Sequence, residues 1–320
     1  MKKKHIMAIV CLFICFMIII FYKKHFNDKV EFSDYALTDS KFFGDVIMSG
    51  NNGHLIFLDK EGNILKEHED VLVNWICGDA QAGVIIAGNV QYELRKIEVD
   101  SEYNVISNKV LFKSEYLMID PTIVQLEDGT WILSYVEIQG TVNNADANCE
   151  NGVYTVYVYK SRDLCQWEFV SNPVSEKRNI EDGDMFELDE KVYYLYEKES
   201  LDKSVSEICV RFSEDGCEHW SEEKIIIPDN GDNEMASVDV QEDTVLLYYS
   251  SDLKKPGKSY NGASVYKAKY DFDFNSIEIG IPINIMEKEG ILLYDVYINQ
   301  EGNQYLYSRN YLTDNTLVLK

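Results

Sequence analysis

The chain has 320 residues and carries 55 acidic against 30 basic side chains, a formal net charge of −25 at pH 7. This negative charge repels nucleic acid and anionic lipid surfaces, which excludes phosphate-rich partners as main ligands. Aromatic residues make up 12% of the chain and include 22 tyrosines, a content that favours β-structure around one large core.

The N-terminus has the pattern of an uncleaved membrane anchor. Residues 6–22 form an uninterrupted apolar run with lysines on both sides. The run is at the short end of the length that spans a bilayer, and no small-residue cleavage site follows it. We therefore expect a signal anchor with a single transmembrane helix at 1–26. A linker at 27–42 then leads to a domain at 43–320 that lies outside the cytoplasm, at the cell membrane.

The domain is predicted to consist of short antiparallel strands, most clearly between residues 119 and 170. An Asp-Gly turn at 128–129 and a second polar turn at 161–167 separate segments in which β-branched and aromatic residues recur at period two. These segments are 119–126, 131–135, 153–159 and 168–170. Four such strands in sequence are typical of one β-propeller blade.

Similar units before and after this one predict an all-β fold, a β-propeller of five or six four-stranded blades. Tyrosine-rich second strands recur roughly every 50 to 60 residues after the first hairpin, which is predicted at 45–49 and 54–58. Two arrangements fit: six blades with a reduced first one, or five blades with the N-terminal strands completing the last. In both, a terminal strand pairs with the other end of the chain, because ring closure removes open sheet edges.

One polar turn occurs twice, with serine, aspartate and tryptophan at similar spacing: Ser161, Asp163 and Trp167, then Ser213, Asp215 and Trp220. Serine and aspartate in such a turn bond to backbone groups of the turn, so their expected role is structural. Both copies resemble the Asp-box of sialidase-type propellers. The first is closer to the turn of five-bladed glycosidases such as those of glycoside hydrolase family 43.

The Ile-Asp-Pro segment at 119–121 is also similar to an inner strand of family 43 propellers. In that family the aspartate orients and tunes the catalytic acid, which is the role the resemblance implies for Asp120. It further implies a general base on an earlier inner strand, where Asp45 is the candidate, and an acid in the next blade. The family has Glu-Gly-Pro there, whereas this chain has Asp182 and Asp184 around a glycine. The alternative acids are Glu181, Glu187 and, one blade further on, Glu234.

The residues themselves also favour carboxylate chemistry at the axis. The first strand of each blade lines the axis, and an acid stands near the start of almost every predicted inner strand: Asp45, Asp120, Asp182 or Asp184, Glu234 and Asp295. Glycoside hydrolysis uses two carboxylates, one protonated as the acid and one acting as base or nucleophile, and crowding raises one pKa. In so acidic a chain, however, acids at these positions are also expected without a catalytic role.

Three further residues are candidates for binding substrate. Trp75 is placed to stack on a sugar ring, Arg178 to meet an anionic group and Asp295 to add a polar contact at the axis. The chain has five arginines, few for the three-arginine carboxylate clamp of a sialidase. No phosphate loop or zinc spacing is present, so no cofactor or dedicated metal site is predicted, although the aspartates are compatible with calcium.

Three functions follow from these patterns. The favoured one is a membrane-anchored, extracytoplasmic glycosidase-like propeller that acts on a neutral or weakly charged polysaccharide with axis carboxylates as acid and base. The second is a non-catalytic propeller that binds glycans, and the third is a protein-interaction scaffold of the cell envelope. An open axis pocket with opposed carboxylates would separate the first function from the other two.

Overall fold

The computed structural model describes residues 29–32, 35–140, 152–200, 202, 204–285, 289–299, 302–310 and 316–320. The predicted anchor at 1–26 lies outside these residues. Within the described ranges, no helix has the length and apolar character needed to cross a membrane.

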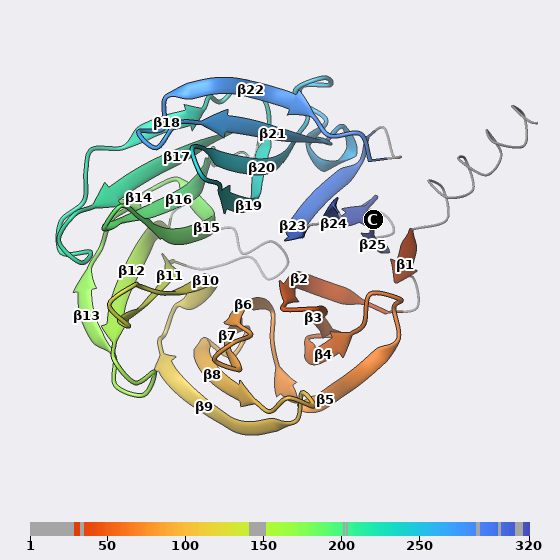
Figure 1. Cartoon of the computed structure of the whole chain (residues 1–320), viewed down its shortest axis with the longest axis vertical. Coiled ribbons are helices and arrows are strands. Elements are labelled where there is room, and N and C mark those ends of the chain that lie inside the picture. Colours follow the sequence, from red (N-terminus) through yellow and green to blue (C-terminus); the bar gives the residue numbers. More distant parts are fainter. Residues whose placement is uncertain are drawn as a thin grey trace, which may run out of the picture.

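The described residues form an all-β propeller with six blades around one axis (Figure 1). From the axis outward, blade 1 contains β2 (Leu37–Phe43), β3 (Val46–Asn51), β4 (His54–Leu58) and β5 (Ile64–Leu72). Blade 2 contains β6 (Trp75–Asp79), β7 (Val84–Asn89), β8 (Glu93–Val99) and β9 (Val105–Lys113). Blade 3 contains β10 (Leu117–Gln125), β11 (Trp131–Gln139), β12 (Val153–Ser161) and β13 (Glu168–Ser171), and β14 (Ser175–Glu176) also pairs with β12.

Blade 4 contains β15 (Asn179–Leu188), β16 (Lys191–Glu199), β17 (Ser206–Ser213) and β18 (Lys224–Ile227). Blade 5 contains β19 (Asn233–Val240), β20 (Val245–Ser251), β21 (Ser264–Tyr270) and β22 (Ser276–Pro282). Blade 6 contains β23 (Ile291–Asn299), β24 (Gly302–Arg309), β25 (Thr316–Leu319) and β1 (Val30–Phe32). A short 3-10 helix, η1 (Ser259–Asn261), lies between β20 and β21. The propeller prediction is confirmed.

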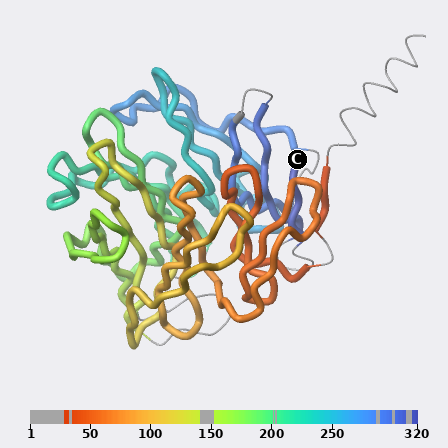
Figure 2. The backbone as a smooth tube through the Cα atoms, turned by 60° about the horizontal axis from the view of Figure 1, so that its bottom comes forward, coloured from red at the N-terminus to blue at the C-terminus, as the bar shows by residue number. Residues whose placement is uncertain are grey.

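The ring closes through the N-terminal strand, as expected of a propeller. β1 is the outermost strand of blade 6 and pairs antiparallel with β25, with Val30 opposite Leu319 and Phe32 opposite Leu317. Figure 2 shows the red N-terminal segment beside the blue C-terminal blade. Phe32 is 2% exposed and packs in a core cluster formed by residues of blades 1 and 6.

The beginning of the propeller differs from the sequence prediction. β1 and β2 lie within the stretch 27–42 that was expected to be a linker, and the predicted inner strand at 45–49 largely coincides with β3, the second strand of blade 1. Gly44, with φ of 63°, and Asp45 form the turn between β2 and β3. Blade 1 is therefore a complete four-stranded blade, and the N-terminal strand completes the last one.

The core is divided between neighbouring blades, because the second strands are buried on both faces. In β16, Tyr194 and Tyr196 belong to the cluster shared with blade 3, whereas Tyr193 and Leu195 belong to the cluster shared with blade 5. Alternation at period two thus supplies two interfaces from one strand. This packing explains the tyrosine-rich second strands and holds each inner strand at the axis.

Replacing Phe32, which packs where the two ends of the chain pair, should destabilise the propeller. We expect Phe32→Ala to lower the free energy of unfolding by about 3 to 5 kcal/mol, because the cavity would lie where the two chain ends pair. Urea unfolding followed by circular dichroism measures this loss. Ile277→Ala on β22, another outermost strand, is the control, since Ile277 is 56% exposed and should change stability by no more than about 0.5 kcal/mol. Equal losses in both variants would contradict this account of closure.

Candidate active site at the propeller axis

The inner strands enclose a cavity of about 190 Å³ at the axis. Four blades contribute charged side chains to its lining: Asp39 and Lys41 from β2, Asp120 from β10, Asp182 and Asp184 from β15, and Asp295 from β23. Blades 2 and 5 contribute uncharged residues, among them Cys77 and Ala236. All five aspartates are half-buried, so they face the cavity rather than bulk solvent.

Irregular strand pairing brings three of these aspartates to the cavity. The pairing register shifts in β2, β10 and β15 at the positions that contain Asp39, Asp120 and Asp182. A β-bulge adds a residue to one strand and redirects its side chain. Asp120 and Asp182 have φ angles of 46° and 50°, a left-handed conformation that residues with a Cβ atom rarely adopt. Such strain persists only where the surrounding structure imposes it, and it is concentrated at functional sites.

A glycine beside the bulge in β15 allows the strand to approach its neighbour closely. A Cβ atom on Gly183 would lie 2.4 Å from the hydroxyl oxygen of Tyr194, a fully buried side chain on β16. The glycine between Asp182 and Asp184 is therefore required by packing, as well as being a feature of the family pattern that the segment resembles.

The aspartates also connect neighbouring blades. In three places a carboxylate oxygen accepts a hydrogen bond from a backbone N–H of the next inner strand around the ring: Asp39 from Ile76 at 2.7 Å, Asp120 from Asp182 at 3.1 Å and Asp295 from Phe42 at 2.8 Å. A charge-assisted bond of this kind orients the carboxylate and ties one blade to the next. The same residues are thus available for chemistry and for structure.

Lys41 provides the positive charge of the cavity. Its Nζ atom donates to the backbone carbonyl oxygens of Tyr294 at 3.1 Å and Ala236 at 3.5 Å, in blades 6 and 5. Burial lowers its pKa, but the nearby carboxylates, first Asp39 and then Asp295, raise it more, so the ammonium stays charged. Among the described residues that line the cavity it is the only cation, opposite five aspartates. The cavity therefore disfavours anionic ligands.

The pKa values of the carboxylates are raised, which makes protonated forms available near neutral pH. Burial raises the pKa of Asp182 and that of Asp184 to about 6 each, although Lys41 opposes both shifts. Burial, followed by the neighbouring charge of Asp182, raises the pKa of Asp120 well above its usual value. Burial also raises the pKa of Asp39, against the effect of Lys41. A carboxylic acid that can donate a proton is therefore available here.

Glu234 lies behind the cavity rather than in its lining. It is 7% exposed, and its carboxylate lies within 4.8 Å of oxygens from Asp182 and Glu197. Burial and the charge of Asp182 raise the pKa of Glu234 well above its usual value. The distance to Asp182 is shorter than the roughly 5 to 10 Å between two carboxylates that flank a glycosidic bond. Glu234 is therefore too close to Asp182 to face it across a substrate.

Asp45, the predicted general base, is placed elsewhere. Its side chain is 87% exposed in the β2–β3 turn, where it lies 3.6 Å from Lys60 and accepts a hydrogen bond from Tyr297. Asp39 occupies the inner strand of blade 1 instead. The sequence holds a signal for this arrangement, since two residues of Gly-Asp type between extended segments indicate a hairpin turn. A turn at 44–45 makes the segment before it, which contains Asp39, the inner strand of blade 1.

Two predicted substrate-binding residues do not line the cavity. Trp75, at the start of β6, packs against the core cluster of blades 3 and 4. Arg178 lies 3.0 Å from Glu207, and its Nε and Nη2 atoms donate to backbone carbonyl oxygens at 199 and 198. These contacts direct it away from a ligand at the axis. Asp295 is the predicted substrate-binding residue that does line the cavity.

Comparison with known proteins supports the fold. No protein-family model matches this chain, and no curated protein sequence does so either. Among solved structures, the α-L-arabinanase of Penicillium chrysogenum complexed with arabinobiose has a TM-score of 0.58 at 11% identity, covering 92% of this chain and 97% of that one. A mutant α-L-arabinofuranosidase of Fusarium graminearum with an iminosugar inhibitor has a TM-score of 0.55 at 10% identity, covering 91% and 96%.

The endo-arabinase of Bacteroides thetaiotaomicron also matches, with a TM-score of 0.51 at 12% identity over 77% of this chain and 92% of that one. The resemblance to propeller glycosidases that the sequence suggested is therefore confirmed at the level of fold. This chain differs from the five-bladed expectation of that resemblance, because its propeller has six blades.

The raised pKa of Asp184 predicts a pH dependence of stability. Its pKa is 3.8 in the unfolded chain and about 6 in the folded one, so the folded state binds more protons in between and stability falls as pH rises through this window. Between pH 5.0 and pH 7.5, ionisation of Asp184 alone should lower the free energy of unfolding by about 1 kcal/mol.

Asp184→Asn should remove this part of the pH dependence, because the amide does not ionise and its oxygen still accepts from the N–H of Met185. Urea unfolding at the two pH values measures the change. Asp45→Asn, at an exposed position, should leave the dependence as it is in the unmodified protein. An unchanged slope in Asp184→Asn would contradict the assignment.

Proposed function

We propose that this chain is a glycosidase that acts on a terminal neutral sugar residue of an oligosaccharide or polysaccharide. The observation that carries the proposal is the convergence of aspartates from four blades on one small cavity, three of them placed by bulges. A propeller can bury its axis with apolar side chains. The use of strained backbone to assemble carboxylates instead is characteristic of a site built for chemistry.

The geometry supports a role for each group. Asp184 is the candidate general acid, because its pKa near 6 lets it hold a proton for the leaving glycosidic oxygen. Asp39 is the candidate base, since it lies on a different blade from Asp184 and the charge of Lys41 opposes the rise in pKa that burial causes. As the carbon–oxygen bond breaks, Asp184 gives its proton to the departing oxygen. Asp39 removes a proton from the water that attacks the anomeric carbon. Asp120 orients the backbone of β15 through its bond to Asp182.

Charge and size define the substrate class. One ammonium among five aspartates disfavours acidic sugars, whereas neutral hydroxyl groups can donate to the carboxylates and accept from Lys41. The cavity volume of about 190 Å³ is below the roughly 300 to 1,000 Å³ of ligand pockets for larger molecules. A single sugar unit at a chain end suits this space, with the rest of the glycan extending outside it.

We also propose that the apolar segment 6–22 anchors the domain at the outer side of a cell membrane. The proposal rests on the length and flanks of that segment. It would place the propeller among extracellular or envelope glycans. Cell fractionation with protease accessibility of the propeller tests it, and a cytosolic, protease-protected domain would contradict it.

A non-catalytic, glycan-binding propeller is the alternative, and one observation favours it. Asp39, Asp120 and Asp295 each hold the next blade through a backbone hydrogen bond, so the fold alone gives them a role. The glutamate that family 43 places in this region is also replaced by an aspartate. On this reading the protein binds the same neutral sugars but does not cleave them.

Hydrolysis assays with active-site variants separate these functions. Arabino-oligosaccharides and nitrophenyl α-L-arabinofuranoside come first, because the structural neighbours are named arabinanases and an arabinofuranosidase. Other neutral glycosides follow. Asp39→Asn and Asp184→Asn should each lower kcat/KM by roughly 10²- to 10⁴-fold, since each removes a proton-transfer group.

Asn at position 39 keeps an oxygen that accepts from Ile76, so the fold should be retained. Asp45→Asn is the control and should match the unmodified enzyme. Calorimetric binding of a glycan without product formation would replace the catalytic proposal with the binding function. Full activity in both active-site variants would remove the axis carboxylates from the mechanism.

The pKa of Asp184 also sets an alkaline limit on activity. The proton needed by the leaving group is present below about pH 6 and is lost above it, so kcat/KM should fall by about tenfold per pH unit on the alkaline side. Initial rates between pH 4.5 and 8.5 on the best substrate measure this profile. A rate that is constant from pH 6 to pH 8 would show that Asp184 is not the acid.

A further inference from the structure

A second group of carboxylates lies between blades 4 and 5, next to Asp182 but outside the cavity lining. Glu197 and Glu199 are on the same face of β16, Asp232 immediately precedes β19, and Glu234 is within β19. We call these four residues the inter-blade cluster. Their exposed fractions are 1%, 3%, 3% and 7%. Oxygens of Glu197, Glu199 and Asp232 lie within 4.8 Å of one another, and an oxygen of Glu197 also lies within 4.8 Å of one from Glu234.

The backbone around the cluster is held firmly. Asp252, fully buried, accepts from the N–H of Asp232 at 3.0 Å. Asn233 donates through its side chain to backbone oxygens at 206, 228 and 231. Asn179 donates to Glu199 at 2.8 Å. These contacts fix the positions of the carboxylates before any ligand arrives, so ligand binding would require little reorganisation.

Glu197 is the residue that points to a ligand. Only 1% of Glu197 is exposed, and its Oε2 atom has no hydrogen-bond partner among the described residues. That side chain belongs to both groups of adjacent oxygens, so it is directed into the cluster. A buried carboxylate oxygen without a partner is costly to the fold, and native structures rarely retain one without a ligand, ion or water.

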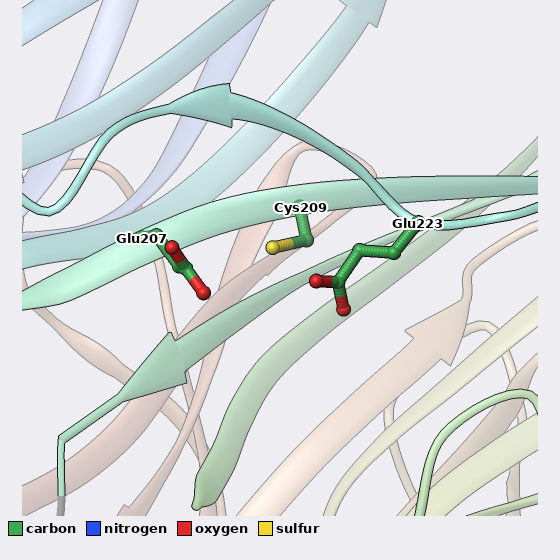
Figure 3. Close-up of side chains that lie close together, drawn as sticks. All are labelled: Glu207, Cys209 and Glu223. Atoms are coloured by element: carbon green, nitrogen blue, oxygen red, sulfur yellow. The ribbon is translucent and has the colours of Figure 1, made fainter.

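Blade 4 also contains another group of buried or half-buried acidic side chains, and these are paired with lysine and arginine. Figure 3 shows Glu207, Cys209 and Glu223 with their side chains directed toward one another. Lys198 lies 3.1 Å from Glu207 and also pairs with Glu223, while Arg178 lies 3.0 Å from Glu207. These cations neutralise that group. Within the described part of the chain, Glu197 and Glu234 form no ion pair with a lysine, arginine or histidine.

The chemistry of the inter-blade cluster selects the ion. All its ligand atoms are carboxylate oxygens, and no described histidine or cysteine is part of it, which disfavours zinc and softer metals. Calcium takes six to eight oxygens at about 2.3 to 2.6 Å in flexible geometry. Oxygens around one calcium ion lie up to about 4.8 Å apart, so oxygens that lie within 4.8 Å of one another can share such an ion. Magnesium requires a stricter octahedron and retains more of its water.

We propose that Glu197, Glu199, Asp232 and Glu234 bind a calcium ion that links blade 4 to blade 5. The ion supplies the positive charge that the surrounding side chains do not supply to Glu197. Its position on two adjacent blades makes its main consequence structural. Burial, followed by the charges of neighbouring carboxylates, raises the pKa of Glu197 and that of Glu234, which agrees with a site where negative charge lacks compensation.

The test uses the full-length protein after removal of metal with a chelator. Calorimetric titration with calcium should show one site per chain, and calcium at 100 times its Kd should raise Tm by about 5 °C. Magnesium should bind more weakly. Absence of calcium binding in the unmodified protein would overturn the proposal, whatever the glycoside assays show, because those assays depend on the axis cavity.

Glu197→Gln should weaken calcium binding by roughly tenfold or more, because it removes a charged ligand. In chelator the same variant should be at least as stable as the unmodified protein, since the substitution relieves buried repulsion. This opposite response with and without calcium distinguishes a ligand from a residue with a packing role. A calcium-induced rise in Tm that is the same in Glu197→Gln as in the unmodified protein would overturn the assignment of this site.

Two control variants complete the design. Glu137→Gln changes a carboxylate that is 9% exposed and hydrogen-bonded to Ser114 and Gln139, outside the cluster. Glu218→Gln changes one carboxylate of an exposed group on the rim, in which Glu218 lies close to Asp215 and His219. Both should bind calcium as the unmodified protein does. Loss of binding in Glu218→Gln alone would assign the ion to the rim and overturn the proposal.

Discussion

Closure of the ring is the constraint on which the rest of this structure depends. Every inner strand is held at the axis by blades on both sides, and that is true of blades 1 and 6 only because β1 pairs with β25. A sheet edge left open there would expose unpaired backbone groups and allow the two chain ends to separate. The five aspartates of the cavity repel one another, so they stay close together only in a frame that cannot widen.

The fold accommodates the crowded aspartates through local devices. Bulges redirect Asp39, Asp120 and Asp182 toward the axis, and backbone N–H groups of the next blade bind the carboxylates. Lys41 offsets part of the charge. Burial, which Lys41 opposes only in part, raises the pKa values of Asp182 and Asp184. Burial beside partly neutralised charges thus suits these groups for proton transfer, a frequent arrangement in active sites.

Blade 4 contains both ways of handling buried acids. On one side, Lys198 and Arg178 neutralise Glu207. On the other side, toward blade 5, no described lysine, arginine or histidine forms an ion pair with Glu197, and Asp182 stands between this region and the axis cavity. Because Lys198 and its neighbours 197 and 199 alternate along one strand, they face opposite sides of the blade. A single strand therefore separates a neutralised interface from one that can accept a cation.

Local patterns in the sequence were sufficient to predict the fold class. Alternation at period two and the turn residues around 128 and 161 act between neighbours in the chain, so most strands, and their grouping into blades after the first blade, follow from the sequence. Asp120, Asp182 and Asp184 were found because they lie in recognisable inner strands. The sequence also contains the Gly-Asp turn at 44–45, but the apolar segments 45–49 and 54–58 predict a hairpin of their own, which assigns to Asp45 the place that Asp39 holds.

The tertiary structure decided what depends on contacts distant in the chain. The number of blades and the strand that completes the last one follow from pairing between residues almost 290 positions apart. The bulges are properties of strand register, which alternation alone does not specify. Burial of Glu197 and Glu199 requires blade 5 to pack beside β16, and nothing in their own segment indicates this. Sequence determined which side chains each strand carries, and the closed ring decided which of them meet, because only packing fixes distances between blades.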